Sequence, residues 1–165
     1  MTKLPASTSY YAGIFGAYSS ETNNTTRLIY NGTNVYGYLN SRAGSGAVMD
    51  KSGRTINTIY TETLERKNNT TMYTSNAFDG VLERAEPPEG TANSANIAIF
   101  SQNTSGSIAS SMKLYYFKIY DNGIPIRSFV PCYRKSDNVI GLYDTITNEF
   151  YVNKGKGNFI KGNDL

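Results

Sequence analysis

Carboxylates are the residues of this sequence whose spacing comes nearest to that of a catalytic pair. A retaining glycosidase needs two carboxylates about 5–5.5 Å apart, flanking the bond that is cleaved. Glu62 and Glu65 are three residues apart, so a strand would turn them to opposite faces. Asp144 and Glu149 straddle an expected turn. We interpret all four as solvated side chains, predict no catalytic residue, and expect that the protein is not an enzyme.

Histidine is absent, and Cys132 is the only cysteine. These facts exclude Ser-His-Asp and Cys-His catalytic sites, histidine-ligated zinc and a disulfide within the chain. Cys132 lies in an apolar run, which favours a buried small side chain. Oxygen atoms could still hold calcium, and Asp144 and Asp121 are the candidate ligands if calcium is found. Both are interpreted first as turn formers, because aspartate accepts hydrogen bonds from its own turn, and no cofactor is otherwise expected.

The segment 112–120 offers the clearest candidate for a binding surface. It alternates as a strand with large side chains on both faces, and we predict that Phe117 and Ile119 point into the core. The outward-facing set combines aromatic rings with an ammonium group: Tyr116, Lys118 and Tyr120. A tyrosine presents a sugar with a flat apolar ring and a hydroxyl. Tyr36 and Tyr38 could extend the same surface. The alternative, that these tyrosines pack beneath a loop, stays open.

The elements that position these residues are predicted to be strands. The chain has 165 residues, with 18 Asn, 17 Thr, 16 Ser and 14 Tyr, and only 18% are charged. This composition favours many short strands joined by polar turns, and no helical stripe of useful length appears. Period-two patterns predict about eleven to thirteen strands. We therefore expect one all-β domain over residues 1–165, with two antiparallel sheets face to face.

Turn residues place several of the expected hairpins. Asn31-Gly32 predicts a tight turn with both residues at positive φ, and Asp121-Asn122-Gly123 predicts another. The segments 139–144 and 149–152 read as a further hairpin, and 55–66 as one long strand. In the expected strand 124–133, Pro125 and Pro131 indicate an edge or a bulge, because proline cannot donate a hydrogen bond to the ladder.

The charge pattern narrows the range of partners. Sixteen Lys and Arg against 13 Asp and Glu leave a net charge of +3, without a block of like charges. A nucleic-acid partner therefore finds no support. No apolar run approaches the roughly 20 residues that cross a bilayer, so membrane insertion is not expected either.

The last third of the chain resembles a known family. The motifs that carry the resemblance are 113–123 (KLYYFKIYDNG), 127–135 (RSFVPCYRK), 141–144 (GLYD), 149–153 (EFYVN) and 155–157 (GKG). In this order they are similar to the C-terminal strands of laminin-G-like, concanavalin A-like lectin domains, which occur in phage tail proteins and in surface proteins of Gram-positive bacteria. The resemblance implies a jelly-roll sandwich of two sheets, located in a virion or at a bacterial cell surface. The chain begins close to its first expected strand, which suggests the C-terminal domain of a longer protein.

Three functions remain. The first is a non-catalytic carbohydrate-recognition or adhesion module that binds a surface polysaccharide or glycan. The second is a structural decoration domain of a phage tail or virion, which contacts neighbouring protein subunits. The third, a glycoside hydrolase, is the weakest, because the carboxylates lack a suitable spacing.

Overall fold

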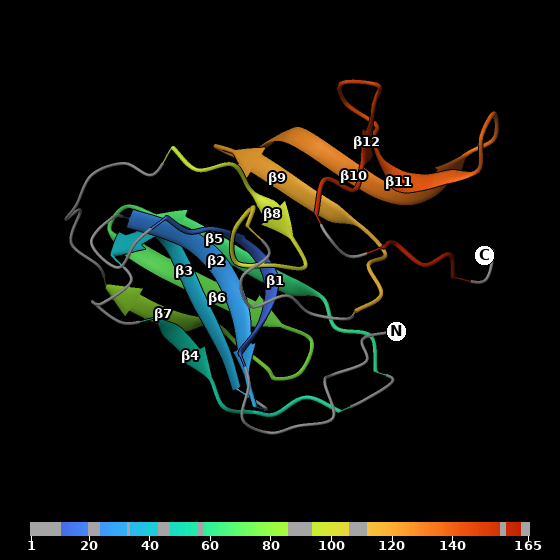
Figure 1. The fold of residues 1–165 in the computed structure, drawn as a ribbon. Coiled ribbons are helices and arrows are strands. Elements are labelled where there is room, and N and C mark those ends of the chain that lie inside the picture. The colour runs from blue at the N-terminus through green and yellow to red at the C-terminus, as the bar shows by residue number, and fades with distance from the viewer. Residues whose placement is uncertain are drawn as a thin grey trace. The chain divides into compact units, whose positions relative to one another are not determined.

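The computed structural model describes residues 11–19, 24–32, 34–42, 47–55, 58–85, 94–105, 112–155 and 158–162. Regular structure in these ranges consists of twelve strands without a helix, as the composition predicts (Figure 1). The described part of the chain accordingly has no helix that could span a lipid bilayer. The chain divides into two compact units, residues 1–112 and residues 113–165. The single domain over residues 1–165 stays a prediction.

The first unit contains two antiparallel sheets. The larger has the strand order β4-β3-β2-β1-β8, and the smaller the order β5-β6-β7 (Figure 1). The strands of the larger sheet are β1 (Tyr11–Ala17), β2 (Asn24–Asn31), β3 (Asn34–Arg42), β4 (Val48–Asp50) and β8 (Ala98–Ile99). Those of the smaller sheet are β5 (Glu62–Lys67), β6 (Thr70–Ser75) and β7 (Leu82–Ala85). Neighbours are consecutive in the chain except for β1 and β8.

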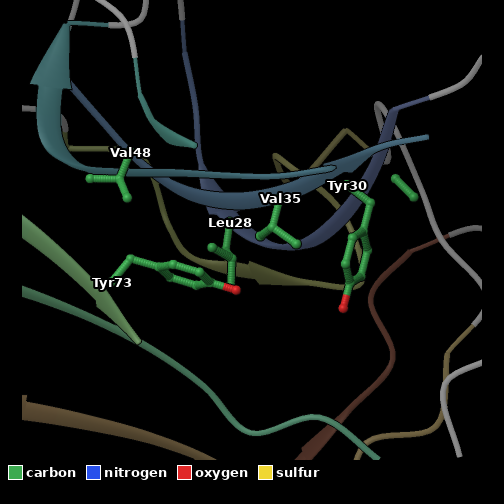
Figure 2. Close-up of a cluster of buried hydrophobic side chains, with 6 residues drawn as sticks. Leu28, Tyr30, Val35, Val48 and Tyr73 are labelled. Carbon is green, nitrogen blue, oxygen red and sulfur yellow. The ribbon is translucent and has the colours of Figure 1, made fainter. Parts of the chain in front are cut away.

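The core of the first unit lies between its two sheets. The larger sheet contributes Leu28, Tyr30, Val35 and Val48, and Tyr73 of β6 meets them from the smaller sheet (Figure 2). Alternation along β2 and β3 selects this face, since Tyr30 pairs with Val35 and paired residues point to the same side. The packing is compatible with a β-sandwich. The expected two sheets are, however, three among the described residues of the whole chain.

Two backbone expectations for the first unit need correction. The hairpin at Asn31-Gly32 forms, but Asn31 pairs with Asn34 inside the ladder, and of these two residues only Gly32 has a positive φ. The long strand over 55–66 is wrong, because β5 begins only at Glu62 and residues 58–61 are irregular. The hydroxyl of Tyr60 accepts a hydrogen bond from the amide of Thr55, which brings residues 55 and 60 together instead of extending them along one strand.

The second unit contains one antiparallel sheet with the order β12-β11-β10-β9. Its strands are β9 (Phe117–Asp121), β10 (Ile124–Arg134), β11 (Val139–Asp144) and β12 (Glu149–Val152). The predicted turn after β9 is confirmed, with Asn122 and Gly123 at φ of 47° and 80° between the paired residues Asp121 and Ile124. The ladder slips by one residue between Pro125 and Arg127, so of the two alternatives expected for Pro125, an edge or a bulge, the structure has the bulge.

Other expectations for the second unit are only partly met. The strand predicted over 112–120 begins at Phe117, where pairing with Phe129 of β10 starts. Phe117, Ile119 and Cys132 are half-buried, although we expected them in the core. The register also turns Phe117 and Cys132 to opposite faces, since Phe117 pairs with Phe129, three residues from Cys132. The described strands of this unit form a single sheet.

Candidate functional site

The predicted binding surface in the second unit has the expected alternation. Tyr116, Lys118 and Tyr120 are exposed, whereas Phe117 and Ile119 are half-buried. Tyr116 is 49% exposed and Tyr120 is 56% exposed. The Lys118 ammonium lies 5.6 Å from the centre of the Tyr116 ring, so the two side chains are close together. We call Tyr116, Lys118 and Tyr120 the tyrosine–lysine row.

The two remaining predicted tyrosines belong to the first unit. Tyr36 and Tyr38 lie on the face of β3 that points away from the core, because they pair with Ile29 and Arg27 rather than with Leu28. Tyr36 is half-buried. Tyr38 is only 9% exposed, and its ring centre lies 4.6 Å from the guanidinium carbon of Arg27. Tyr38 therefore packs against a cation and does not present an open ring to solvent.

Asp144 is a turn former in this structure. It is fully buried, and its Oδ1 accepts hydrogen bonds from the amides of Ser128 and Ile146, at 2.9 and 3.0 Å. Its Oδ2 accepts a bond from the hydroxyl of Thr147 and lies 3.5 Å from Nε of Arg127. Burial pushes the pKa of Asp144 upward, but these donors outweigh it and hold the pKa below its ordinary value. Both oxygens are thus occupied by the protein itself.

The other candidate calcium ligand is also part of a turn. Asp121 closes the β9–β10 hairpin, and its Oδ1 accepts a bond from the side-chain amide of Asn122. Among the described residues, no three side chains of histidine, cysteine, aspartate or glutamate gather in a group that could hold a metal ion. Calcium at Asp121 or Asp144 would therefore need ligands of other kinds.

The carboxylate pairs considered for hydrolysis differ in their placement. Glu62 and Glu65 alternate along β5, half-buried and exposed, as expected for odd spacing. The interpretation of Glu62 as solvated is wrong, because its side chain is only 9% exposed and accepts a hydrogen bond from Nε of Arg54. Asp144 and Glu149 face each other across the β11–β12 hairpin, and the hydroxyl of Thr147 donates toward both, at 3.0 and 3.5 Å. The interpretation of Asp144 as a solvated side chain is wrong, because it is fully buried and accepts from the amides of Ser128 on β10 and Ile146 in the turn. This pair therefore has a structural explanation.

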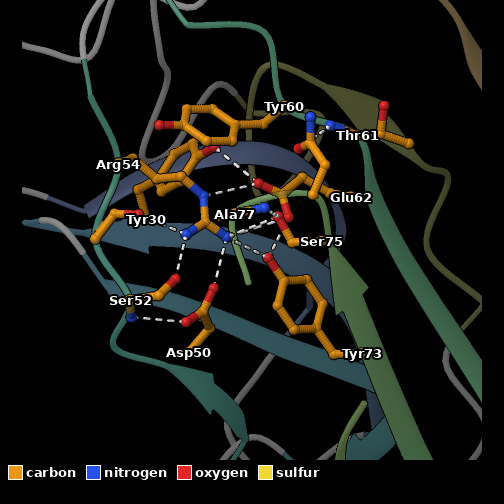
Figure 3. A network of polar contacts seen from close by, with 12 residues as sticks. Tyr30, Asp50, Ser52, Arg54, Tyr60, Thr61, Glu62, Tyr73, Ser75 and Ala77 are labelled. Carbon is orange, nitrogen blue, oxygen red and sulfur yellow. Dashed lines mark hydrogen bonds and ion pairs between the residues drawn. The ribbon is translucent and has the colours of Figure 1, made fainter. Parts of the chain in front are cut away.

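A buried polar cluster in the first unit was not predicted from the sequence (Figure 3). At its centre is Arg54, whose guanidinium is buried between β4, β5 and β6. Nη2 donates to Asp50 at 2.6 Å and to the hydroxyl of Tyr73 at 2.7 Å, and Nε donates to Glu62 at 3.0 Å. Nη1 donates to the hydroxyl of Ser52 and to the carbonyl of Gly53. Every nitrogen of this guanidinium has a partner.

The cluster shifts the titration of its members. Burial raises the pKa of Tyr73, and the carboxylate of Glu62, which accepts a hydrogen bond from the Tyr73 hydroxyl, raises it further. Burial and Glu62 raise the pKa of Tyr30 in the same way. For Asp50, burial acts upward, but bonds from Ser52 and Arg54 prevail and lower the pKa. The cluster therefore holds Asp50 ionised and the tyrosines protonated at neutral pH.

An open polar hollow of about 490 Å³ lies beside this cluster and is lined by Arg54, Thr55, Tyr60 and Asn76, among others. Its polar groups are engaged with one another. Tyr60 bonds to Thr55, and its ring lies 4.9 Å from the Arg54 guanidinium carbon. The side chain of Asn76 accepts from the amide of Thr61 and donates to the carbonyl of Ile59. A ligand would have to replace bonds that already exist, so the hollow is a weak candidate for a binding site.

Only one signal in the sequence could have suggested the cluster. Asp50 and Arg54 are four residues apart, a spacing that indicates an ion pair on a helix. No helix was expected there, so the spacing did not predict this ion pair. Glu62, Tyr73 and Ser75 join them through strand register, which sequence spacing does not contain.

Comparison of the whole chain with protein-family models, with curated proteins and with solved structures finds no match.

Proposed function

We propose that this protein is a non-catalytic carbohydrate-recognition module and that the tyrosine–lysine row contacts the saccharide. The observation that carries the proposal is the exposure of Tyr116 and Tyr120 beside Lys118, on β9 and the residue that precedes it. Neighbouring apolar rings exposed on one face are typical of a surface that binds a partner or ligand. Tyrosine rings stack on the apolar faces of sugars, while phenol and ammonium groups bond to hydroxyls.

The resemblance of residues 113–157 to concanavalin A-like lectin domains supports the same proposal. The proposal includes the jelly-roll form of the sandwich. The pairing of β8 with β1, which is distant in the sequence, supports it. The proposal also includes a place in a phage tail or at a bacterial surface, where many copies compensate for weak binding at each site.

The experiment is a glycan array followed by titration of the strongest binders, watched by tyrosine fluorescence. Tyr116→Ala and Tyr120→Ala are each expected to weaken binding at least tenfold with little change in melting temperature. Tyr133→Ala, which removes an exposed tyrosine from the opposite face of β10, is the matched control and should leave affinity unchanged. Binding that survives in the double variant Tyr116→Ala/Tyr120→Ala would rule out this surface.

A protein partner is the second candidate, favoured by a different observation. Ile124 and Ile126, at the start of β10, are 67% and 41% exposed. Aliphatic side chains contribute to protein interfaces and do not stack on sugars. If this candidate is correct, Ile124→Ser abolishes capture of a neighbouring subunit by the purified protein, while an array of glycans gives no signal.

A further inference from the structure

The first unit buries two arginines that differ in one respect. All three nitrogens of Arg54 donate to the protein, and two carboxylates neutralise it. Arg27, on β2, is 7% exposed, and none of the ion pairs between described residues includes it. A buried cation is normally paired with an anion, because loss of hydration is otherwise uncompensated. Of the two buried arginines, Arg27 is therefore the one without a carboxylate partner among the described residues.

The neighbours of Arg27 leave part of its guanidinium unused. Nη1 donates to Oε1 of Gln102 at 2.7 Å. The guanidinium carbon lies 4.6 Å from the ring centres of both Tyr18 and Tyr38, so the aromatic faces support the charge. Nε, which is shielded from solvent, has no hydrogen-bond partner among the described residues. One strong donor is thus buried without an acceptor.

The backbone positions this arrangement on the face of the larger sheet that points away from the core. Arg27 pairs with Gly16 on one side and with Tyr38 on the other, so all three lie on this face. Gly16 has no side chain, and the backbone of Gln102 crosses directly over it. Gly13 allows the same close approach to Ser101. The two glycines bring Gln102 to Arg27 from 75 residues away.

The geometry points to a carboxylate-binding site at Arg27, whose ligand is the carboxylate of an acidic saccharide such as a hexuronate. A carboxylate accepts from Nε–H in the planar geometry that guanidinium favours and supplies the negative charge that the described neighbours of Arg27 lack. The choice of a saccharide over an acidic peptide rests on the proposed function. Binding requires a covering side chain to move, and Tyr18 is the least buried of the contacts of Arg27.

The test is an NMR titration that observes the Nε–H signals of the arginines directly. Glucuronate is the probe, and glucose is its neutral counterpart. The Arg27 signal is expected to shift with glucuronate to saturation and to stay unchanged with glucose. Arg134 serves as the reference, since its guanidinium is exposed and paired with Asp137. An Arg27 signal that glucuronate leaves unmoved, or that acetate moves with equal affinity, would overturn the assignment.

Two variants make the test independent of folding. Arg27→Gln removes the site but also a packed side chain. Gln102→Glu keeps the packing and supplies a carboxylate from the protein itself at the same 2.7 Å contact. We expect Gln102→Glu to raise the glucuronate Kd at least tenfold and to raise the melting temperature. Unchanged affinity in Gln102→Glu would contradict the inference.

This inference and the proposed function can fail separately. The tyrosine–lysine row belongs to the second unit and Arg27 to the first. Glycan binding that depends on Tyr116 and Tyr120 without any shift at Arg27 overturns the carboxylate site and supports the proposed function. The opposite result is a saturable shift at Arg27 together with a glycan affinity that neither tyrosine variant changes. It supports the carboxylate site and refutes the tyrosine–lysine row as the glycan-binding surface.

Discussion

Replacement of Arg54 by methionine tests whether the buried cluster stabilises the first unit. Methionine fills part of the space of the arginine but donates no hydrogen bond. Asp50 and Glu62, whose side chains are 3% and 9% exposed, then lose the cation that neutralises them. Removal of one member of a buried ion pair costs about 3–5 kcal/mol, because the remaining charge stays desolvated. That is a large part of the roughly 5–15 kcal/mol that stabilise a typical domain.

Urea unfolding at pH 7, followed by the circular dichroism of the strands, measures this loss. With an m value of about 2 kcal/mol/M, a loss of about 4 kcal/mol lowers the midpoint by roughly 2 M. Lys67→Met, at the exposed end of β5, is the control and should change stability by less than about 0.5 kcal/mol. A loss below about 1 kcal/mol in Arg54→Met would refute the reasoning, since it would mean that water reaches both carboxylates.

The dependence on pH provides a second reading of the same cluster. The pKa of Asp50 in the folded protein lies below its ordinary value. The stability that this group contributes is therefore present above the ordinary carboxyl pKa and is lost as the pH falls through the lowered one. In Arg54→Met this loss should begin at a higher pH, because a donor that holds Asp50 ionised is gone. Melting temperatures between pH 2.5 and 7 measure the difference between the two proteins.

Three further results are expected. Since the pKa values of Tyr30 and Tyr73 are raised, stability should be intact below about pH 10 and fall above it, and absorbance at alkaline pH should show both phenols ionising only on unfolding. Asp144→Ala should lower the melting temperature, and calcium should leave that of the native protein unchanged, because amides and a hydroxyl already occupy both oxygens; a rise with calcium would contradict this. Gly16→Ala should cost about 1–3 kcal/mol in urea unfolding, because its new Cβ would lie 2.7 Å from the Cα of Gln102; a neutral result would mean that the crossing segment moves freely.

Much of the backbone follows from local sequence. The hairpin at Asn122-Gly123 could be predicted because both residues tolerate positive φ, which the turn requires. The hairpin of β11 and β12 has the predicted bounds, since two short apolar segments flank a polar turn. Exposure of Tyr116 and Tyr120 likewise follows from the period of two. These features depend on a few neighbouring residues and needed no knowledge of the fold.

Other features were decided only by the tertiary structure. The alternation along 55–66 suggested one strand, but Arg54 is buried, the amide of Thr55 donates to the hydroxyl of Tyr60, and residues 58–61 are irregular. The surroundings of Arg27 come from β1, β3 and the segment around Gln102, and no local pattern brings them together. Local preference sets the direction of each side chain relative to its own strand. Which distant side chain it meets depends on register and on the packing of sheets, so both buried arginines acquired their neighbours only when the strands assembled.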